Sequence, residues 1–155
     1  MRKAIVSGAN GFVGSAVVKE LISQGYEVYA LARENHYDQI PIGEMVRIVP
    51  FSLENIEALG EVIPINEYEA FYHFAWNGSA GVDRADTALQ LKNAQWTVEC
   101  LQMAKRLGCK RFVPAGSIME HETIAAVYTQ GNRPGAGYIY GSGKVAAHMM
   151  CRSMA

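Results

Sequence analysis

KAIVSGANGFVG, residues 3–14, joins a short apolar stretch to three glycines, Gly8, Gly11 and Gly14. Between a strand and a helix, the first glycine permits a tight turn and the second lets the backbone approach a pyrophosphate. The third lets the helix pack closely on the strand. The helix then presents free N–H groups and its positive dipole end to an anion. A plain glycine-rich turn is the alternative, but the apolar stretch before it and the helical pattern after it favour a dinucleotide site.

Short apolar stretches alternate with helical patterns along the rest of the chain. The expected strands are 3–6, 27–31, 46–49, 69–74 and 110–113, and the expected helices are 12–24, 86–107 and 140–154. This alternation predicts parallel strands joined by right-handed crossovers. We therefore expect one α/β domain over residues 1–155, a doubly wound parallel sheet of the Rossmann type, with ligand sites at the carboxyl ends of its strands. A glycine-rich loop is expected at 129–137 beside the site.

Composition narrows the class of protein. The 155 residues are 50% hydrophobic with a formal net charge of -1, which suits one globular domain and gives no electrostatic footprint for nucleic acid or an anionic membrane. No apolar run reaches the length of a signal peptide core or a membrane span. Cys100, Cys109 and Cys151 lack metal-ligand or redox spacing, so we expect reduced thiols in a cytoplasmic protein. His73 stands alone, and no metal site is expected.

A second motif, Tyr140-Gly-Ser-Gly-Lys144, places a tyrosine and a lysine one helical turn apart. A phenol ordinarily ionises near pH 10, and a neighbouring ammonium lowers its pKa. Ser117, at the end of the last expected strand, would hold a substrate hydroxyl or carbonyl beside the phenol. These three residues would move a proton while a nicotinamide moves a hydride. An incidental Tyr–Lys pair on a surface helix is the alternative.

Taken together, these motifs resemble the extended short-chain dehydrogenase/reductases, which include nucleotide-sugar epimerases, dehydratases and reductases. The resemblance covers essentially the whole chain and corresponds to the N-terminal cofactor part of that family. It implies that Ser117, Tyr140 and Lys144 are catalytic and that a nucleotide-linked sugar is the substrate. The cofactor contacts that it implies are Gly8, Asn10, Gly11, Phe12, Val13, Gly14, Arg33, Ser52, Leu53, Phe74, Ala75, Trp76, Asn93, Tyr140 and Lys144.

Residues 112–120, FVPAGSIME, are similar to sugar-nucleotide 4-reductases and epimerases, in which a Gly-Ser pair precedes a glutamate. That similarity implies that Glu120 faces the substrate, whereas the cluster Glu120, His121 and Glu122 by itself indicates a solvated loop. Dehydratases usually carry an acidic pair beside the serine. Ile118 and Met119 follow Ser117 here, which argues against dehydration.

Two positions depart from the family pattern at the expected cofactor site. An acidic residue that binds the ribose hydroxyls usually ends the second strand, but Ala32 and Arg33 stand there. A guanidinium can bind a 2′-phosphate, so NADP is favoured and NAD is the alternative. A solvated loop charge is the other interpretation of Arg33. Ser52 replaces an aspartate that often contacts adenine, which weakens that expected contact.

The resemblance also bears on the whole protein and its partners. The family continues with a smaller substrate-binding region, so we expect the chain to be a fragment without it. In this family the helices matching Asp86–Leu107 and Tyr140–Met154 often form a homodimer interface. A non-catalytic NAD(P)-binding module or regulator, or an inactive fragment that binds only the cofactor, remains the alternative to an enzyme.

Overall fold

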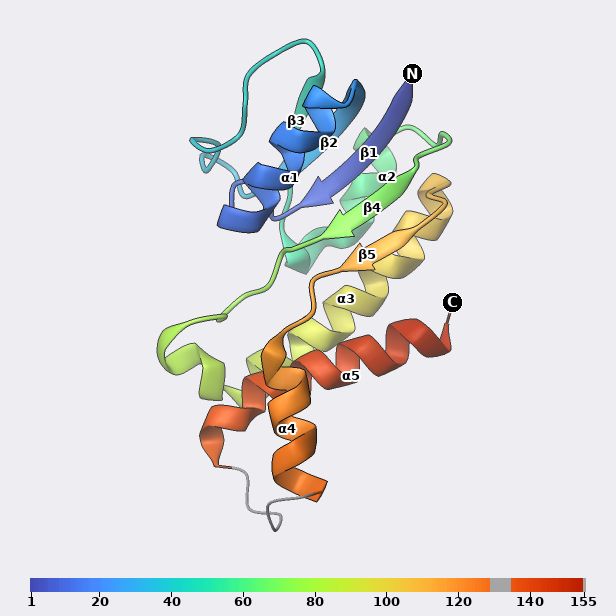
Figure 1. Ribbon diagram of the computed structural model, residues 1–155. Coiled ribbons are helices and arrows are strands. Elements are labelled where there is room, and N and C mark those ends of the chain that lie inside the picture. The colour runs from blue at the N-terminus through green and yellow to red at the C-terminus, as the bar shows by residue number, and fades with distance from the viewer. Residues whose placement is uncertain (129–134, 155) are drawn as a thin grey trace. The chain divides into compact units, whose positions relative to one another are not determined.

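In a computed structural model, residues 1–128 and 135–154 are described (Figure 1). Their contacts group the chain into two compact units. The first comprises Met1–Ala75 and Glu99–Ala115, and the second comprises Trp76–Val98 and Gly116–Ala155. The loop expected at 129–137 falls mostly outside the described residues.

The first unit contains a five-stranded parallel sheet in the order β3-β2-β1-β4-β5. Its strands are β1 (Arg2–Ser7), β2 (Tyr26–Ala32), β3 (Val46–Pro50), β4 (Ala70–His73) and β5 (Phe112–Pro114). This order confirms the doubly wound α/β fold. The order reverses between β1 and β4, and at such a switch point the connections leave on opposite faces and open a crevice for a ligand.

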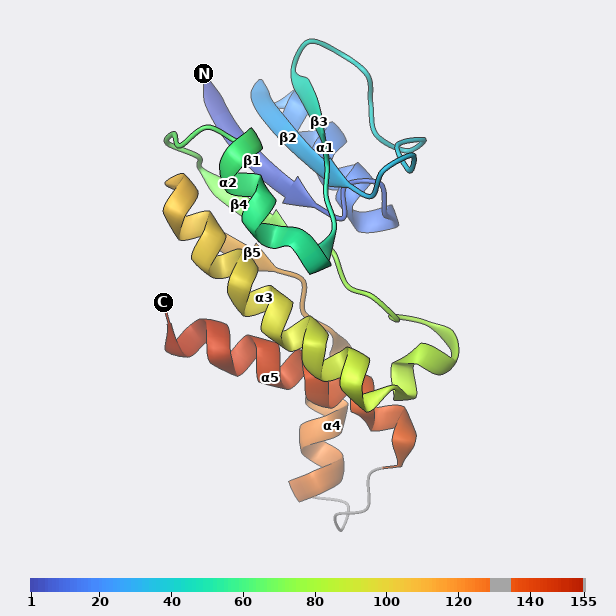
Figure 2. The same ribbon diagram turned by 180° about the vertical axis from the view of Figure 1, so that it is seen from behind.

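Helices cover both faces of this sheet. One face carries α1 (Phe12–Ser23), and the other carries α2 (Leu59–Val62) and the second half of α3 (Thr87–Leu107), as Figures 1 and 2 show from opposite sides. The predictions for α1 and α3 are confirmed. The pattern did not indicate α2 or the short 3₁₀ helix before it, η1 (Leu53–Ala58), because one or two turns give too few periodic positions.

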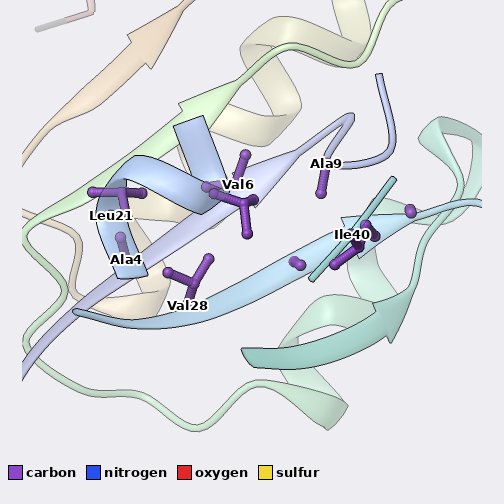
Figure 3. Close-up of a cluster of buried hydrophobic side chains, with 9 residues drawn as sticks. Ala4, Val6, Ala9, Leu21, Val28 and Ile40 are labelled. Atoms are coloured by element: carbon purple, nitrogen blue, oxygen red, sulfur yellow. The ribbon is translucent and has the colours of Figure 1, made fainter. Parts of the chain in front are cut away.

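The core explains why the strands are continuous apolar runs. Ala4 and Val6 on β1 and Val28 on β2 pack against Leu21 of α1 in one buried cluster (Figure 3). The intervening residue Ile5 is also fully buried, on the opposite face. Strands covered on both faces lose the alternation of polar and apolar residues that a half-exposed strand shows.

The second unit is helical. It contains η2 (Gly81–Ala85), the first half of α3, α4 (Ile118–Tyr128), η3 (Ala136–Tyr138) and α5 (Ile139–Ser153). The solvated loop expected around Glu120, His121 and Glu122 is wrong, because all three lie in α4. Within the described part of the chain, no helix is long and apolar enough to cross a membrane.

Candidate active site

The glycine turn leaves the end of β1 and stays anchored to the sheet. Gly8 adopts a φ of +68°, a left-handed conformation that side chains other than glycine rarely adopt. The N–H of Ala9 donates to the carbonyl of Leu31 at 3.1 Å, and the N–H of Gly11 donates to that of Gly8 at 2.9 Å. The turn is therefore held by its own backbone and by β2.

This turn has no room for added side chains. A Cβ on Gly14 would lie 2.1 Å from the Gly8 carbonyl oxygen, so only glycine lets α1 come this close to the turn. A Cβ on Gly8 would lie 2.8 Å from both the amide nitrogen of Ala75 and the carbonyl carbon of Phe74. The structure thus brings Phe74 and Ala75, two predicted cofactor contacts, against the turn.

The first turn of α1 begins without a side-chain cap. Gly11 caps α1 without any side-chain hydrogen bond, so the first backbone N–H groups have no partner inside the helix. The side chains of Phe12 and Val13 are exposed here, Phe12 to 95%. The Asn10 Oδ1 accepts a hydrogen bond from the N–H of Gln39 at 2.7 Å, which ties the turn to the loop after β2.

The ends of β2 and β3 carry the predicted adenosine contacts. The N–H of Phe51 donates to the carbonyl of Ala32 at 2.8 Å, which brings the next residues, Arg33 and Ser52, to the same edge of the sheet. Arg33 is exposed. Leu53, the residue after Ser52, is buried and anchors η1.

Glu54 is an acidic neighbour that no motif in the sequence indicated. Its carboxylate is hydrogen-bonded to the hydroxyl of Ser52, which also accepts from the N–H of Glu54 at 3.3 Å. These hydrogen bonds and the charge of Arg33 lower the pKa of Glu54. Ser52 therefore acts as the N-cap of η1, and a contact with adenine would compete with that role.

His73 has a structural role within the first unit. Its Nδ1 lies 2.8 Å from the Oγ of Ser7, and the ring is 3% exposed and stacks on Phe112. The Ser7 Oγ also accepts from the N–H of Ala75 at 3.4 Å. In the described ranges, no three His, Cys, Asp or Glu side chains are grouped as a metal site requires.

In the second unit, Tyr140 and Lys144 are both buried on α5, 9% and 7% exposed. The Lys144 Nζ lies 3.7 Å from the ring centroid of Trp76 and 5.9 Å from that of Tyr140. Burial lowers the pKa of Lys144 to about 8, although the charge of Glu120 acts in the opposite direction. The three aromatic and cationic groups predicted to contact the cofactor here therefore form one cluster.

Two glycines between Tyr140 and Lys144 let α5 approach its neighbours. A Cβ on Gly141 would lie 2.0 Å from the Thr123 Oγ1 on α4, and one on Gly143 would lie 2.9 Å from the carbonyl oxygen of Gln90 on α3. The Gly-Ser-Gly sequence is thus part of the site's construction. The two glycines are part of the sequence motif, but only the packing of α5 against α3 and α4 shows why small residues are needed there.

Two buried amides of α3 fix the loop that carries Trp76. The Asn93 side chain accepts from the N–H of Asn77 at 2.9 Å and donates to its carbonyl at 2.7 Å. Gln90 accepts from the indole N–H of Trp76 at 2.8 Å and donates to the carbonyl of Gly78 at 2.9 Å. Asn93 therefore organises this loop, and Gln90 is a supporting residue that the sequence did not point to.

Arg84 is a second residue that the motifs did not reveal. Its guanidinium carbon lies 4.3 Å from the ring centroid of Tyr140, and its Nη1 donates to the carbonyl of Ser79 at 3.1 Å. It places a cation on the face of the phenol ring. A lone arginine in a 3₁₀ turn gives no signal in the sequence that could have identified this contact.

Ser117 begins α4 in a capping box. Its Oγ accepts from the N–H of Met119 at 3.2 Å, and its own N–H donates to the Glu120 Oε1 at 2.8 Å. The pattern Ser-x-x-Glu at 117–120 is the sequence signal that could have predicted this helix. The nearby Thr123 Oγ1 is buried and makes no hydrogen bond among the described residues.

The sheet order, the glycine turn at the switch point and the uncapped start of α1 define an α/β protein of the dinucleotide-binding class. Within that class, the chain belongs to the NAD dependent epimerase/dehydratase family, whose profile matches residues 4–155. The resemblance inferred from the motifs is therefore confirmed.

Similarity to known proteins extends over most of the chain. The chain is 30% identical over 118 residues to dTDP-6-deoxy-L-talose 4-dehydrogenase (NAD(+)) of Aggregatibacter actinomycetemcomitans. The alignment covers 75% of this chain and 42% of that enzyme. Its fold matches the epimerase Mth375 of Methanothermobacter thermautotrophicus with a TM-score of 0.77 at 22% identity, covering 99% of this chain and 47% of that one. It also matches the Bordetella bronchiseptica enzyme WbmG, solved with NAD, with a TM-score of 0.76 at 18% identity, covering 97% and 49%. The chain spans about half the length of these relatives.

Proposed function

We propose that this chain carries the cofactor-binding and proton-transfer residues of an NAD(P)-dependent enzyme that epimerises, oxidises or reduces a nucleotide-linked sugar. The observation that carries the proposal is the buried cluster in which the Lys144 ammonium, the Tyr140 phenol and the Trp76 indole meet. Burying a charged lysine is costly, and strongly perturbed titratable groups of this kind are concentrated at functional sites. One relative named above is, by its name, a dehydrogenase of dTDP-6-deoxy-L-talose, which supports the substrate class.

Each residue has a distinct task in this proposal. Tyr140 gives or takes the proton of the reacting sugar oxygen, and Lys144 stabilises the phenolate by its positive charge. The hydroxyl of Ser117 orients that oxygen by a hydrogen bond. A bound nicotinamide would supply or accept the hydride. Epimerisation, reduction and dehydration share these tasks, and Ile118 and Met119 after the serine favour the first two.

Tyr140→Phe tests the proposal in the protein as its gene encodes it, including any residues after Ala155. Loss of the acid/base should lower kcat by about 10²-fold or more while leaving cofactor affinity nearly unchanged. Turnover would be followed with UDP- and dTDP-linked hexoses and 4-ketohexoses, by nicotinamide absorbance for reduction and by NMR for epimerisation. Tyr26→Phe on β2 is the control. Unchanged turnover in the Tyr140 variant would refute the assigned role.

The competing proposal is a module that binds the dinucleotide without turnover. The glycine turn alone would suffice for it, whereas the buried Lys144 and Tyr140 would have no use there. Cofactor binding with no reaction of any sugar nucleotide in the wild-type protein would favour this module.

We propose further that NADP is preferred over NAD. Arg33 is exposed directly after β2, where the guanidinium can bind a 2′-phosphate, although the family and the WbmG complex are described with NAD. Arg33→Ala should weaken NADPH binding about tenfold and NADH binding little, because a charge-assisted hydrogen bond contributes about 1.5 kcal/mol or more. Fluorescence titration measures both. Glu54→Gln removes the opposing carboxylate and should strengthen NADPH binding, and equal affinities in the wild type would contradict the preference.

The homodimer and the cytoplasmic location remain predictions. Leu91 on α3 is 61% exposed, and Met149 and Met150 on α5 are 61% and 59% exposed. Exposed apolar side chains on both helices favour a protein interface there. Sedimentation of the wild type against Met149→Lys tests it, and a monomeric wild type would contradict it.

A further inference from the structure

We propose that Glu120 is a positioning residue of the candidate active site: its carboxylate, held by His148, fixes Ser117 and connects it to the helix that carries Lys144. This inference rests on the proposed function of Ser117 and Lys144. Neither the family match nor the motif assigns this task to Glu120. The resemblance implied only that it faces the substrate.

The first step is the contact with Ser117. The Glu120 Oε1 accepts the backbone N–H of Ser117 at 2.8 Å, so it fixes the residue whose hydroxyl would orient the sugar oxygen. A Cβ on Gly116 would lie 3.3 Å from the same Glu120 oxygen. Gly116 therefore leaves the carboxylate room to reach back over the start of α4.

The second oxygen makes a contact that a capping box does not require. The Glu120 Oε2 lies 2.9 Å from the His148 Nδ1 on α5. His148 stands one helical turn after Lys144, on the same face of α5. The Glu120 side chain is 14% exposed, whereas that of His148 is 48% exposed. A shielded carboxylate thus connects the Ser117 end of α4 with the helix that carries Tyr140 and Lys144.

The third step is electrostatic. Burial of Lys144 lowers its pKa to about 8, and the negative charge of Glu120 raises it. Among the described residues, the titratable groups at this cluster include Tyr140 on α5, Glu120 on α4 with its partner His148, and Arg84 of η2 across the Tyr140 ring. Of these groups, Glu120 is the one whose charge raises the pKa of Lys144.

Glu120→Gln separates the effect of the negative charge from the effect of the hydrogen bond to Ser117. Glutamine keeps an acceptor for the Ser117 N–H and a group able to meet His148, but it removes the negative charge. The pKa of Lys144 should then fall, by about half a unit or more, and the alkaline limb of kcat should move to lower pH by the same amount. Below that limb, turnover of Glu120→Gln should exceed that of Glu120→Ala. Glu122→Gln, at an exposed position of the same helix, is the matched control.

Two further variants test the geometry. Glu120→Ala removes both oxygens and should lower kcat about tenfold even at the pH optimum, and Glu120→Gln should restore most of this loss. His148→Ala should produce part of the same loss. His148→Asn, which keeps a donor near the Nδ1 position, should rescue it. Circular dichroism and thermal unfolding confirm that each variant is folded.

A direct readout needs no turnover. The titration of Lys144 is followed by NMR in protein labelled with ¹³Cε-lysine, with the signal assigned by its loss in Lys144→Arg. The inference is overturned if Glu120→Gln moves neither this titration nor the alkaline limb more than Glu122→Gln does. The proposed function fails separately if Tyr140→Phe retains full turnover, whatever the Lys144 titration shows.

Discussion

The candidate site of the first unit is built from backbone, whereas that of the second unit is built from side chains. At the glycine turn, Gly8, Gly11 and Gly14 let backbone segments approach one another by having no Cβ, and the start of α1 carries no side-chain cap. In the second unit, Tyr140 and Lys144 depend on close packing of α5 for their positions. A backbone site is therefore specified by glycine spacing, and a side-chain site is specified by its neighbours.

The most severe test of this contrast is Gly141→Ala on α5. The new methyl group would meet the Thr123 Oγ1 at 2.0 Å and the Met119 carbonyl oxygen at 2.7 Å, so α4 and α5 must separate. We expect a loss of about 3 kcal/mol in the free energy of unfolding, measured by urea denaturation. Adding Thr123→Ala should restore part of this loss, because it removes the nearer contact. Full stability of the single variant would contradict the packing argument.

The corresponding change in the backbone site is Gly14→Ala. Its methyl group would lie 2.1 Å from the Gly8 carbonyl oxygen, and the first turn of α1 would move away from the glycine turn. We expect about 2 kcal/mol of destabilisation and a cofactor affinity at least tenfold weaker, measured by calorimetry. Gly25→Ala is the control, because no atom lies within 4 Å of the position that its methyl group would take, and only its φ of +77° opposes the change. Equal loss in both variants would weaken the argument from close approach.

The contrast also explains which features the sequence predicts. The glycine turn, the five strands and the long helices follow from local pattern, since each depends on residues near one another in the chain. The Tyr140–Lys144 pair follows from the helical repeat. Helix α4 was not predicted, because its charged residues are also typical of a solvated loop, although the capping residues Ser117 and Glu120 were present. Gln90 and Arg84 could not be predicted, because their partners lie in other segments and only packing brings them together.

A smaller effect is expected at the buried amide of Asn93. Asn93→Ala would leave the N–H and the carbonyl of Asn77 without this partner. Stability should fall by about 1.5 kcal/mol, and hydrogen exchange at Asn77 should become faster. Gln95→Ala, an exposed position of the same helix, is the control. Unchanged exchange at Asn77 would show that the loop is held by other contacts.

The smallest effect concerns charge rather than shape. The pKa of Lys144 is lowered to about 8 in the folded protein from an ordinary value of 10.5. Between these two pH values the unfolded chain therefore binds more protons than the folded protein. Stability relative to Lys144→Met should therefore rise with pH, by about 1 kcal/mol between pH 8 and about pH 9. Denaturation of both proteins across this window measures the difference. If the stability difference between wild type and Lys144→Met did not change with pH, the pKa of Lys144 would be the same in the folded and unfolded states.

The hydrogen bonds that hold Asn77 also bear on its chemical stability. Asn77 precedes Gly78, and an Asn-Gly pair is prone to deamidation when its backbone can bend so that the glycine nitrogen attacks the asparagine side chain. Here Asn93 holds the Asn77 N–H and carbonyl, and Gln90 holds the carbonyl of Gly78. Two side chains of α3 thereby restrain the backbone on both sides of the Asn77–Gly78 peptide bond. Asn77 should therefore resist spontaneous conversion to aspartate while these hydrogen bonds are intact.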